Sequence, residues 1–172
     1  MPDQTIPEAP GWRPMAEADL ASVLAVAAEV HPDYPEDRAV FAERLRLVPA
    51  GCRVLDGAAG LAGYVVSHPW SGGPPALDSL LGALPDTPET WYLHDLALLS
   101  GARGSGAGAA IVAHLAAQAR AAGFTTMSLV AVGGSTGFWG RQGFSVVADP
   151  ALAEKLASYG ATARFMVRRL SP

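Results

Sequence analysis

The sequence predicts an α/β domain built on a mixed β-sheet. Three observations lead to this class: segments rich in β-branched and aromatic residues, segments whose apolar residues recur at helical spacing, and glycine or proline turns between them. Their order is typical of α/β folds: a hairpin, then strand, helix, strand, helix and two further strands. With 172 residues, of which 50% are hydrophobic, the chain is long enough to bury a core.

The first thirty residues predict a leader, a short strand and a helix. Residues 1–10 are polar and rich in proline, so we expect a flexible leader ahead of a single domain over 11–172. A short strand fits residues 11–15. From Leu20 onward, apolar residues recur at i, i+3, i+4 and i+7, and this spacing predicts an amphipathic helix over 16–30.

A second helix is predicted over 36–48. Pro35 suits a first helical turn because no N–H is needed there, and Glu36 and Asp37 place acidic side chains at the positive end of the helix dipole. An apolar stripe at helical spacing follows these residues.

The next part of the chain predicts a hairpin and a long connection. Residues 52–56 and 61–68 flank a Gly-Ala-Ala-Gly turn, and the second segment contains β-branched and aromatic residues, which favours antiparallel strands. The connection over 69–90 contains five prolines and a small helical patch over 77–84. Connections of this length are typical of functional lids or disordered inserts, so we interpret this one in the same way.

The stretch from 91 to 122 carries the strongest functional signal. An apolar run over 93–99 suits a buried strand, and a short turn joins it to the glycine-rich loop 103–108. A helical pattern starts at once and ends at Gly123, a residue type common after helices. Backbone N–H groups at a helix start have no intrahelical partners, and glycines let a phosphate approach them closely. This stretch therefore predicts a cofactor that carries a pyrophosphate.

The remaining elements are shorter. They are predicted in this order: a strand over 124–132, a short helix opened by Gly133-Gly134-Ser135 and closed by Gly143, a strand over 144–148, a short helix over 151–159 and a last strand over 162–170.

Composition and charge exclude several classes of protein. The net charge is −4 and no basic block is present, which argues against nucleic acid as a partner. Cys52 is the single cysteine, so we expect a buried structural thiol, with no internal disulfide and no metal site. The chain has no run of 18 apolar residues and its start has no apolar signal segment, so we expect a soluble, cytoplasmic protein without membrane contact.

The glycine loop by itself fits more than one kind of phosphate site. Residues 104–109 also match the G-x-G-x-x-A pattern of dinucleotide-binding folds. Those folds need an acidic residue at the end of the next strand to hold the ribose, but the strand over 124–132 runs into Gly133 without one. The loop also lacks the Gly-Lys-Ser/Thr ending of a P-loop. A nicotinamide-dependent oxidoreductase is therefore a distant alternative.

Two motifs together resemble the GNAT family of N-acetyltransferases. Leu96-Ala97-Leu98 followed by the loop from Arg103 to Gly108 resembles the family's L-A-V and R-G-x-G-x-G signature. The segment from Phe138 to Phe144 resembles its F-Y-x-x-x-G-F segment, and the order of elements from 11 to 170 also matches. The resemblance implies a splayed, mixed but mostly antiparallel sheet flanked by helices, with acetyl-CoA as co-substrate in the gap between two strands.

The resemblance also implies the cofactor-binding residues. The pantetheine would be bound by the strand residues Leu96, Ala97 and Leu98. The pyrophosphate would be bound by the loop and helix start, which comprise Arg103, Gly104, Ser105, Gly106, Ala107, Gly108 and Ala109. Ser135 and Trp139, near the second motif, complete the set.

The chain departs from the family pattern at two positions. Trp139 stands where the family often has a tyrosine that protonates the leaving thiolate, and an indole N–H is no acid at neutral pH. Gly133 or Gly134 stands where a cofactor-contacting asparagine is common, with Ser135 as a substitute donor. A thiol pKa of roughly 8.5 makes the thiolate a fair leaving group without an acid.

His94 is the predicted general base for an amine nucleophile. A protonated alkylamine with a pKa of about 10.4 is unreactive at neutral pH, so a nearby base is useful. Strand alternation places Tyr92, His94 and Leu96 on one face, and Asp95 on the other unless a bulge intervenes. An arylalkylamine branch of the family resembles this chain in carrying histidines at the positions of Tyr92 and His94. Asp95 is the second choice for the base. Tyr92 is the other catalytic candidate, with a packing or orienting role favoured over acid catalysis.

The function predicted from these residues is acetyl transfer from acetyl-CoA to a primary amine by direct attack in a ternary complex. The acceptor, a small-molecule or peptide amine, would lie among the 31–35 loop, the 69–90 connection and the last strands. A homodimer is compatible with this prediction. The alternative is a catalytically silent acyl-CoA-binding or regulatory domain, which the tryptophan at 139 favours.

Overall fold

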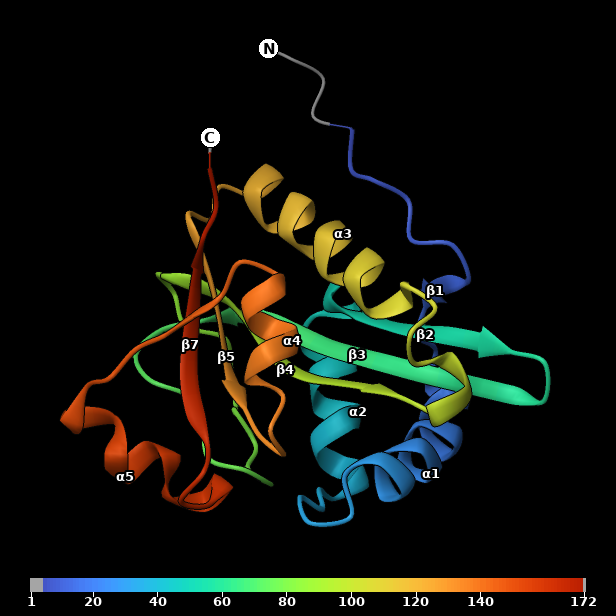
Figure 1. Cartoon of the computed structure of the whole chain (residues 1–172), viewed down its shortest axis with the longest axis horizontal. Helices are drawn as coiled ribbons and strands as arrows, with labels where there is room; N and C mark the ends of the chain where they lie inside the picture. The colour runs from blue at the N-terminus through green and yellow to red at the C-terminus, as the bar shows by residue number, and fades with distance from the viewer. Residues whose placement is uncertain (1–4, 172) are drawn as a thin grey trace.

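The computed structural model describes residues 5–171 and shows an open sheet with helices on both faces (Figure 1). Seven strands form the sheet: β1 (Trp12–Pro14), β2 (Cys52–Gly57), β3 (Gly60–Trp70), β4 (Thr90–Leu98), β5 (Thr126–Ala131), β6 (Ser145–Val146) and β7 (Arg164–Arg169). Their spatial order is β1-β2-β3-β4-β5-β7-β6. All neighbouring strands are antiparallel except β4 and β5, so the predicted mixed, mostly antiparallel sheet flanked by helices is confirmed.

The order of helices and strands along the chain is the predicted one. The α-helices are α1 (Leu20–Val30), α2 (Arg38–Leu47), α3 (Ala107–Ala121), α4 (Thr136–Arg141) and α5 (Ala153–Leu156). Short 3₁₀ turns lie at η1 (Glu17–Asp19), η2 (Pro49–Gly51), η3 (Ser100–Ala102), η4 (Pro150–Leu152) and η5 (Ala157–Tyr159).

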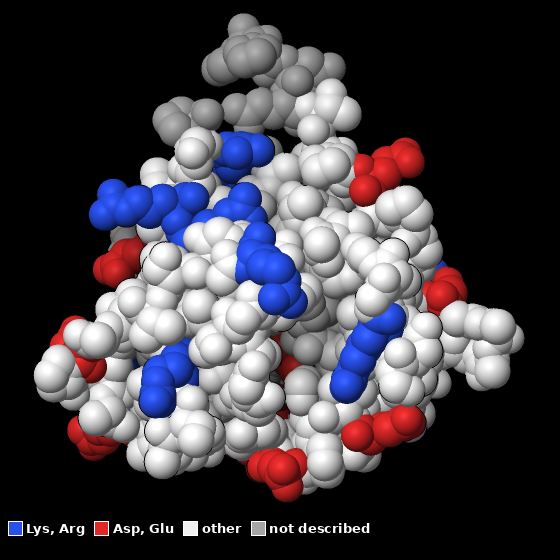
Figure 2. Space-filling model, in the orientation of Figure 1, with Lys and Arg blue, Asp and Glu red and all other residues white. Residues whose placement is uncertain are grey.

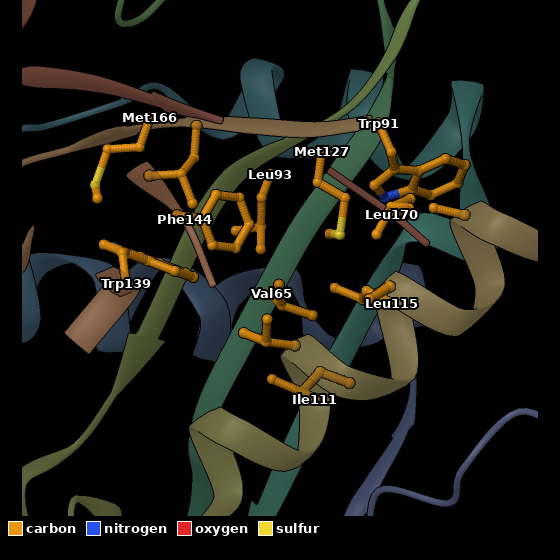
Figure 3. Packing of buried hydrophobic residues seen from close by; sticks show 14 of the residues in the cluster. Val65, Trp91, Leu93, Ile111, Leu115, Met127, Trp139, Phe144, Met166 and Leu170 are labelled. Atoms are coloured by element: carbon orange, nitrogen blue, oxygen red, sulfur yellow. The ribbon is translucent and has the colours of Figure 1, made fainter. Parts of the chain in front are cut away.

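Each face of the sheet has its own hydrophobic core. Ile111 and Leu115 of α3 pack with Val65, Leu93 and Met127 from the sheet (Figure 3). On the opposite face, side chains of α1 and α2 pack on the other side of β2 and β3. Because a helix buries only one stripe, the sheet needs helices on both faces to bury both of its sides.

The sheet splays between β4 and β5. These two strands pair at only two positions, Trp91 with Met127 and Tyr92 with Ser128. Beyond Tyr92 the strands have no register partners in each other, so the polar backbone edges of residues 93–98 and 129–131 face a gap rather than a ladder. This arrangement leaves backbone groups free to bind a ligand.

A β-bulge in β4 sits at His94. Val66 of β3 pairs with Asp95 and Ser67 pairs with Leu93, so His94 is an extra residue in the ladder. Beyond the bulge, each side chain of β4 therefore points to the face opposite to the one that simple alternation predicts. The prediction that Leu96 shares a face with Tyr92 and His94 is therefore wrong, because Leu96 packs against the α3 core.

Two local predictions about helices are wrong. The second helix begins at Arg38 rather than at residue 36, because Asp37 is the N-cap and its carboxylate accepts from the N–H of Ala39. The leucines over 77–84 form no helix; residues 71–89 run as turns and extended chain. Four prolines and three glycines in that segment disfavour a helix.

The 71–89 segment is bound to α2 by hydrogen bonds and contains no helix or strand of its own. Glu43 accepts hydrogen bonds from the backbone N–H groups of Leu81 and Gly82, and Arg44 donates to the carbonyl of Ser79. Arg44 also pairs with Glu43 at 2.9 Å in a buried position. The segment is thus anchored beside the splay.

The predicted leader is described only in part. Residues 1–4 lie outside the described residues. Residues 5–10 contain no helix or strand, but the Pro7 carbonyl lies 2.8 Å from Nδ1 of His114 and Ala9 packs on the core. Flexibility of residues 1–10 stays a prediction, as does the single-domain boundary at residue 11.

Candidate active site in the splay of the sheet

A cleft of about 810 Å³ occupies the gap between β4 and β5. One end, which we call the donor end, is lined by the glycine loop, the start of α3, and α4. The other end, which we call the acceptor end, is lined by the segment between α1 and α2, by the β-bulge and by single residues from two loops: residues 31–34, Glu36, Leu77, His94, Asp95 and Tyr159. Figure 2 shows acidic atoms inside the hollow in the middle of this face and basic side chains on its rim.

His94 is bonded to a carboxylate that lies far away in sequence. Its Nε2 is 2.8 Å from Oε1 of Glu36, and the two side chains are 1% and 5% exposed. An ionised carboxylate can only accept, so the Nε2–H donates and Nδ1 of the neutral ring keeps its lone pair. That Nδ1 is buried and has no hydrogen-bond partner within residues 5–171. The pair is a buried base with a fixed orientation.

Glu36 is itself held on its second oxygen. The backbone N–H of Asp78 donates to Oε2 of Glu36 at 3.0 Å, and Oδ1 of Asp78 accepts from the N–H of Asp37 at 2.7 Å. Asp78 adopts a φ of 54°, a left-handed conformation that is uncommon outside glycine. The 71–89 segment thus positions the carboxylate that positions His94.

A second histidine–carboxylate pair lies beside the first because of the bulge. Asp95 stands on the same side of the sheet as His94, where its Oδ1 is 3.1 Å from Nε2 of His31 and its Oδ2 accepts from the hydroxyl of Tyr64. Burial tends to lower the pKa of His31, but the hydrogen bond and charge of Asp95 outweigh it, and the pKa is raised. The condition under which Asp95 was expected to join His94 is therefore met.

Tyr92 is not among the residues that line the cleft. Its side chain is buried near His68 and His94, with ring centroids 5.5 Å and 6.3 Å away. Burial raises the pKa of Tyr92 well above its ordinary value. Such a phenol keeps its proton and packs, which agrees better with the orienting role than with acid catalysis.

The glycine loop provides open backbone at the donor end. Gly104 and Gly106 have φ values of 78° and 85°, and no heavy atom lies within 4 Å of the position that a Cβ would take at either residue. At Gly108 a Cβ would meet Phe138 at 3.2 Å and Leu98 at 3.3 Å, so the first turn of α3 packs closely. An exposed turn leading into a 15-residue helix suits a pyrophosphate.

Most of the predicted cofactor residues line the cleft, and four candidates do not. The lining residues are Leu96, Leu98, Arg103, Gly104, Gly106, Gly108, Ala109, Ser135 and Trp139, together with the predicted base His94. The residues outside the lining are Tyr92, Ala97, Ser105 and Ala107. Ala97 packs on the α1 face, and the carbonyl of Ala107 accepts from the indole of Trp12.

The residues near the second motif are oriented by local contacts. Trp139 is 7% exposed and packs edge-on against Phe138 and Phe144, with ring centroids 4.8 Å and 5.6 Å away. The hydroxyl of Ser135 donates to the carbonyl of Val132 at 2.7 Å. Trp139 is therefore a core residue whose edge borders the cleft. Cys52 is buried and is not among the cleft-lining residues, and burial raises its pKa to about 12, as fits a structural thiol.

Sequence reasoning missed Glu36, Tyr159 and Arg141 as cleft residues. Glu36 was assigned to the helix dipole, although an aspartate directly after it is the better N-cap and leaves Glu36 outside the helix. Arg141 lies inside the second motif, where its charge beside a phosphate site was a usable signal. Tyr159 lies in η5, directly after α5, and lines the cleft. No local sequence pattern indicates that this part of the chain folds back to the cleft.

Comparisons with known proteins identify the family and agree with the fold. The sequence profile described as Acetyltransferase (GNAT) family matches residues 17–144, about three quarters of the chain. No curated protein matches the sequence. In the part of the chain that is described, no helix has the length and apolarity needed to cross a bilayer.

Solved structures with similar folds share little sequence with the chain. The GphF GNAT-like decarboxylase in complex with isobutyryl-CoA has a TM-score of 0.77 at 18% identity, over 93% of this chain and 99% of that one. Ard1 from Thermoplasma volcanium has a TM-score of 0.70 at 17% identity, over 94% and 97%. The ribosomal-protein-S18-alanine N-acetyltransferase from Escherichia coli has 0.64 at 16% identity, over 94% of both chains.

Proposed function

Because the chain belongs to the acetyltransferase (GNAT) family, we propose that it is an N-acetyltransferase that moves an acetyl group from acetyl-CoA to a primary amine. Transfer from an acyl-CoA donor follows from the family; the acetyl group, the amine acceptor and direct attack in a ternary complex are our proposal. The observation that carries it is one cleft with a phosphate-suited loop at one end and a buried base at the other.

The donor end supports binding of CoA. The open backbone at Gly104 and Gly106 would receive the pyrophosphate, with Arg103 and Arg141 as nearby cations. Strand residues 96–98, whose edge lacks a partner in β5, would bind the pantetheine through their backbone groups. Among the solved relatives of this fold, the GphF protein holds isobutyryl-CoA, which supports a CoA thioester as the donor.

His94 would accept the proton of the amine. Its Nε2–H is fixed by Glu36, so the lone pair of Nδ1 is the basic site, and the neutral amine attacks the thioester carbonyl carbon while the C–S bond breaks. The thiolate then leaves with the bonding electron pair. Trp139 offers no acidic proton, so release depends on the modest basicity of the thiolate.

Two measurements on the purified protein test this function. Calorimetry with acetyl-CoA and CoA should show binding, and thiol release should be detected when amines are added to protein with acetyl-CoA. Isobutyryl-CoA serves as a second donor to test the preference for acetyl. If neither acetyl-CoA nor CoA binds, the proposed function is wrong.

A silent acyl-CoA-binding domain is the second candidate. The observation in its favour is the tryptophan at 139 where the family often has an acid. Binding without thiol release across a broad amine panel would support it against the enzyme. Cytoplasmic location and a homodimer remain parts of the proposal, to be tested by cell fractionation and by sedimentation.

A further inference from the structure

The acceptor end of the cleft is acidic. It contains three carboxylates, Asp33, Glu36 and Asp95, and the only titratable groups of opposite sign among its lining residues are His31 and His94. Even with both imidazoles protonated, the carboxylates outnumber the positive charges. The side chains that line this end therefore include more acidic groups than basic ones, whatever the protonation of the histidines.

Lysine and arginine line the cleft only at the opposite end. The two lining residues of these types are Arg103, beside the glycine loop, and Arg141, at the end of α4. Arg44 lies behind the acceptor end with its side chain buried; its Nη1 donates to Glu43 and to the Ser79 carbonyl, while Nε and Nη2 have no partner among residues 5–171. Among residues 5–171, no lysine or arginine side chain lines the acceptor end itself.

The two carboxylates beside the β-bulge, Glu36 and Asp95, already have hydrogen-bond partners. Glu36 accepts from His94 and from the Asp78 backbone, and Asp95 contacts His31 and the Tyr64 hydroxyl. Both groups therefore have hydrogen-bond partners on each of their oxygens and lie in a largely buried wall. An incoming carboxylate would face them with no lysine or arginine on this wall to pair with, which is unfavourable in a poorly hydrated site.

Apolar and aromatic side chains form the rest of the acceptor end. Tyr34 is half-buried, Tyr159 is buried with its hydroxyl bonded to the Pro75 carbonyl, and Leu77 lies beside them. These surfaces suit the carbon skeleton of a ligand, while the acidic wall suits an ammonium group.

Resting on the proposed function, we propose that the acceptor is a cationic amine with no free carboxylate beside its nitrogen, so that free α-amino acids are excluded. The charges along the cleft then match both substrates: the anionic CoA lies at the basic end and the ammonium arrives at the acidic end. A peptide N-terminus belongs to the accepted class, because its first residue carries an amide.

A matched series of amines tests this class. Tyramine, L-tyrosinamide and L-tyrosine share one skeleton and differ in the group beside the amine: hydrogen, a neutral amide and a carboxylate. We expect kcat/KM for tyrosine to be at least about tenfold below both others. Basicity by itself would rank tyramine last, because its amine is the hardest to deprotonate, so the charge effect gives a different order. A short alkylamine series, with and without the carboxylate, and a peptide amide extend the comparison to other shapes.

A charge reversal and its control locate the discrimination. Asp33→Arg, at an exposed position of the acceptor end, should raise the kcat/KM of tyrosine relative to tyramine several-fold, and added salt should weaken this change. Asp86→Arg, at an exposed aspartate outside the cleft lining, should leave the ratio unchanged. Calorimetric affinity for CoA should be the same in all three proteins.

The outcomes separate this inference from the proposed function. Acetylation of carboxylate-bearing amines as efficiently as their carboxylate-free partners, or acetylation of them alone, would overturn the substrate class while the transferase stands. A protein that binds acetyl-CoA but releases no thiol with any amine would overturn the transferase itself.

Discussion

Glu36 decides what His94 can do. A histidine on a strand is an ordinary core residue unless something fixes which nitrogen carries the proton, and the carboxylate at 2.8 Å does so. The same principle applies to His31, where Asp95 is the partner. Both carboxylates owe their places to backbone features, an N-cap that leaves Glu36 outside α2 and a bulge that turns Asp95 toward His31.

Replacing either member of the first pair should slow acetyl transfer without weakening CoA binding. His94→Gln removes the basic nitrogen and should lower kcat by roughly 10²- to 10⁴-fold at pH 7. Glu36→Gln keeps a hydrogen bond but loses the charge that orients the ring, so a smaller loss is expected. Steady-state kinetics and calorimetry measure both effects.

The matched control for that experiment is His114→Gln, which lies outside the cleft. It should leave kcat unchanged. A His94→Gln protein with full kcat and reduced melting temperature would assign His94 a structural role only.

His68 should make the protein sensitive to acid. The residue is fully buried among Trp70, Tyr92 and His94, and this burial lowers its pKa to about 3. Between that value and the ordinary pKa near 6.5, the unfolded chain binds a proton that the folded protein refuses. Stability should therefore fall by about 1.4 kcal/mol per pH unit as the pH drops below about 6.5.

Urea unfolding of the wild type and of His68→Leu from pH 7 to pH 4.5 checks this prediction. The variant should show a shallower slope, whatever its stability at pH 7. Equal slopes for the two proteins would mean that other groups cause the acid sensitivity. His31 works in the opposite sense, because its raised pKa adds stability at low pH that is lost as the pH rises through that pKa.

At the scale of elements, the start of α3 depends on a left-handed glycine. Gly106 is the N-cap with a φ of 85°, a conformation that costs other residues about 1–2 kcal/mol. Gly106→Ala should therefore reorient the first turn and weaken CoA binding. Calorimetry measures the affinity, and the melting temperature measures the strain.

Gly123→Ala controls for the strain itself. Gly123 lies after the other end of α3, with a φ of 92° and no atom near the position of a Cβ. It should lower the melting temperature to a similar extent but leave CoA affinity unchanged. If both variants lost affinity equally, general destabilisation rather than the phosphate site would explain the effect.

The 71–89 segment should matter for the acceptor and not for the donor. Its backbone at Asp78 holds Glu36, and Glu43 binds it at Leu81 and Gly82. Glu43→Gln weakens this anchor, so the acceptor KM should rise several-fold while CoA affinity stays constant. Hydrogen exchange should be faster in residues 77–84 of the variant.

This experiment can be interpreted only if the Glu43→Gln variant stays folded. Arg44 stays bonded to the Ser79 carbonyl in the Glu43→Gln variant, which limits the cost of the lost charge. An unchanged acceptor KM, with exchange in 77–84 accelerated, would show that the segment has no part in acceptor binding.

At the scale of the whole molecule, the splay divides the sheet into two halves joined by two residue pairs. A ligand that binds both walls of the gap would hold the halves together. Saturating CoA should therefore slow hydrogen exchange in residues 93–98 and 103–109, and leave the hairpin of β2 and β3 unchanged. Mass spectrometry of exchanged peptides checks this, and protection confined to the hairpin would contradict the placement of CoA.

The sequence by itself determined the class of fold, the order of nearly all elements and the phosphate-suited loop. These features depend on local patterns: apolar periodicity, β-branched runs and glycines at a helix start. The resemblance carried by two motifs named the family, which the match over residues 17–144 confirms.

Only the tertiary structure decided which side chains meet at the cleft. His94 and Glu36 are 58 residues apart, His31 and Asp95 are 64 apart, and Tyr159 arrives from the far end of the chain. A single extra residue in β4 moved Leu96 to one face and Asp95 to the other, because strand alternation has a period of two. Local sequence specifies whether a strand forms, but its register and bulges depend on packing against partners that are distant in the chain.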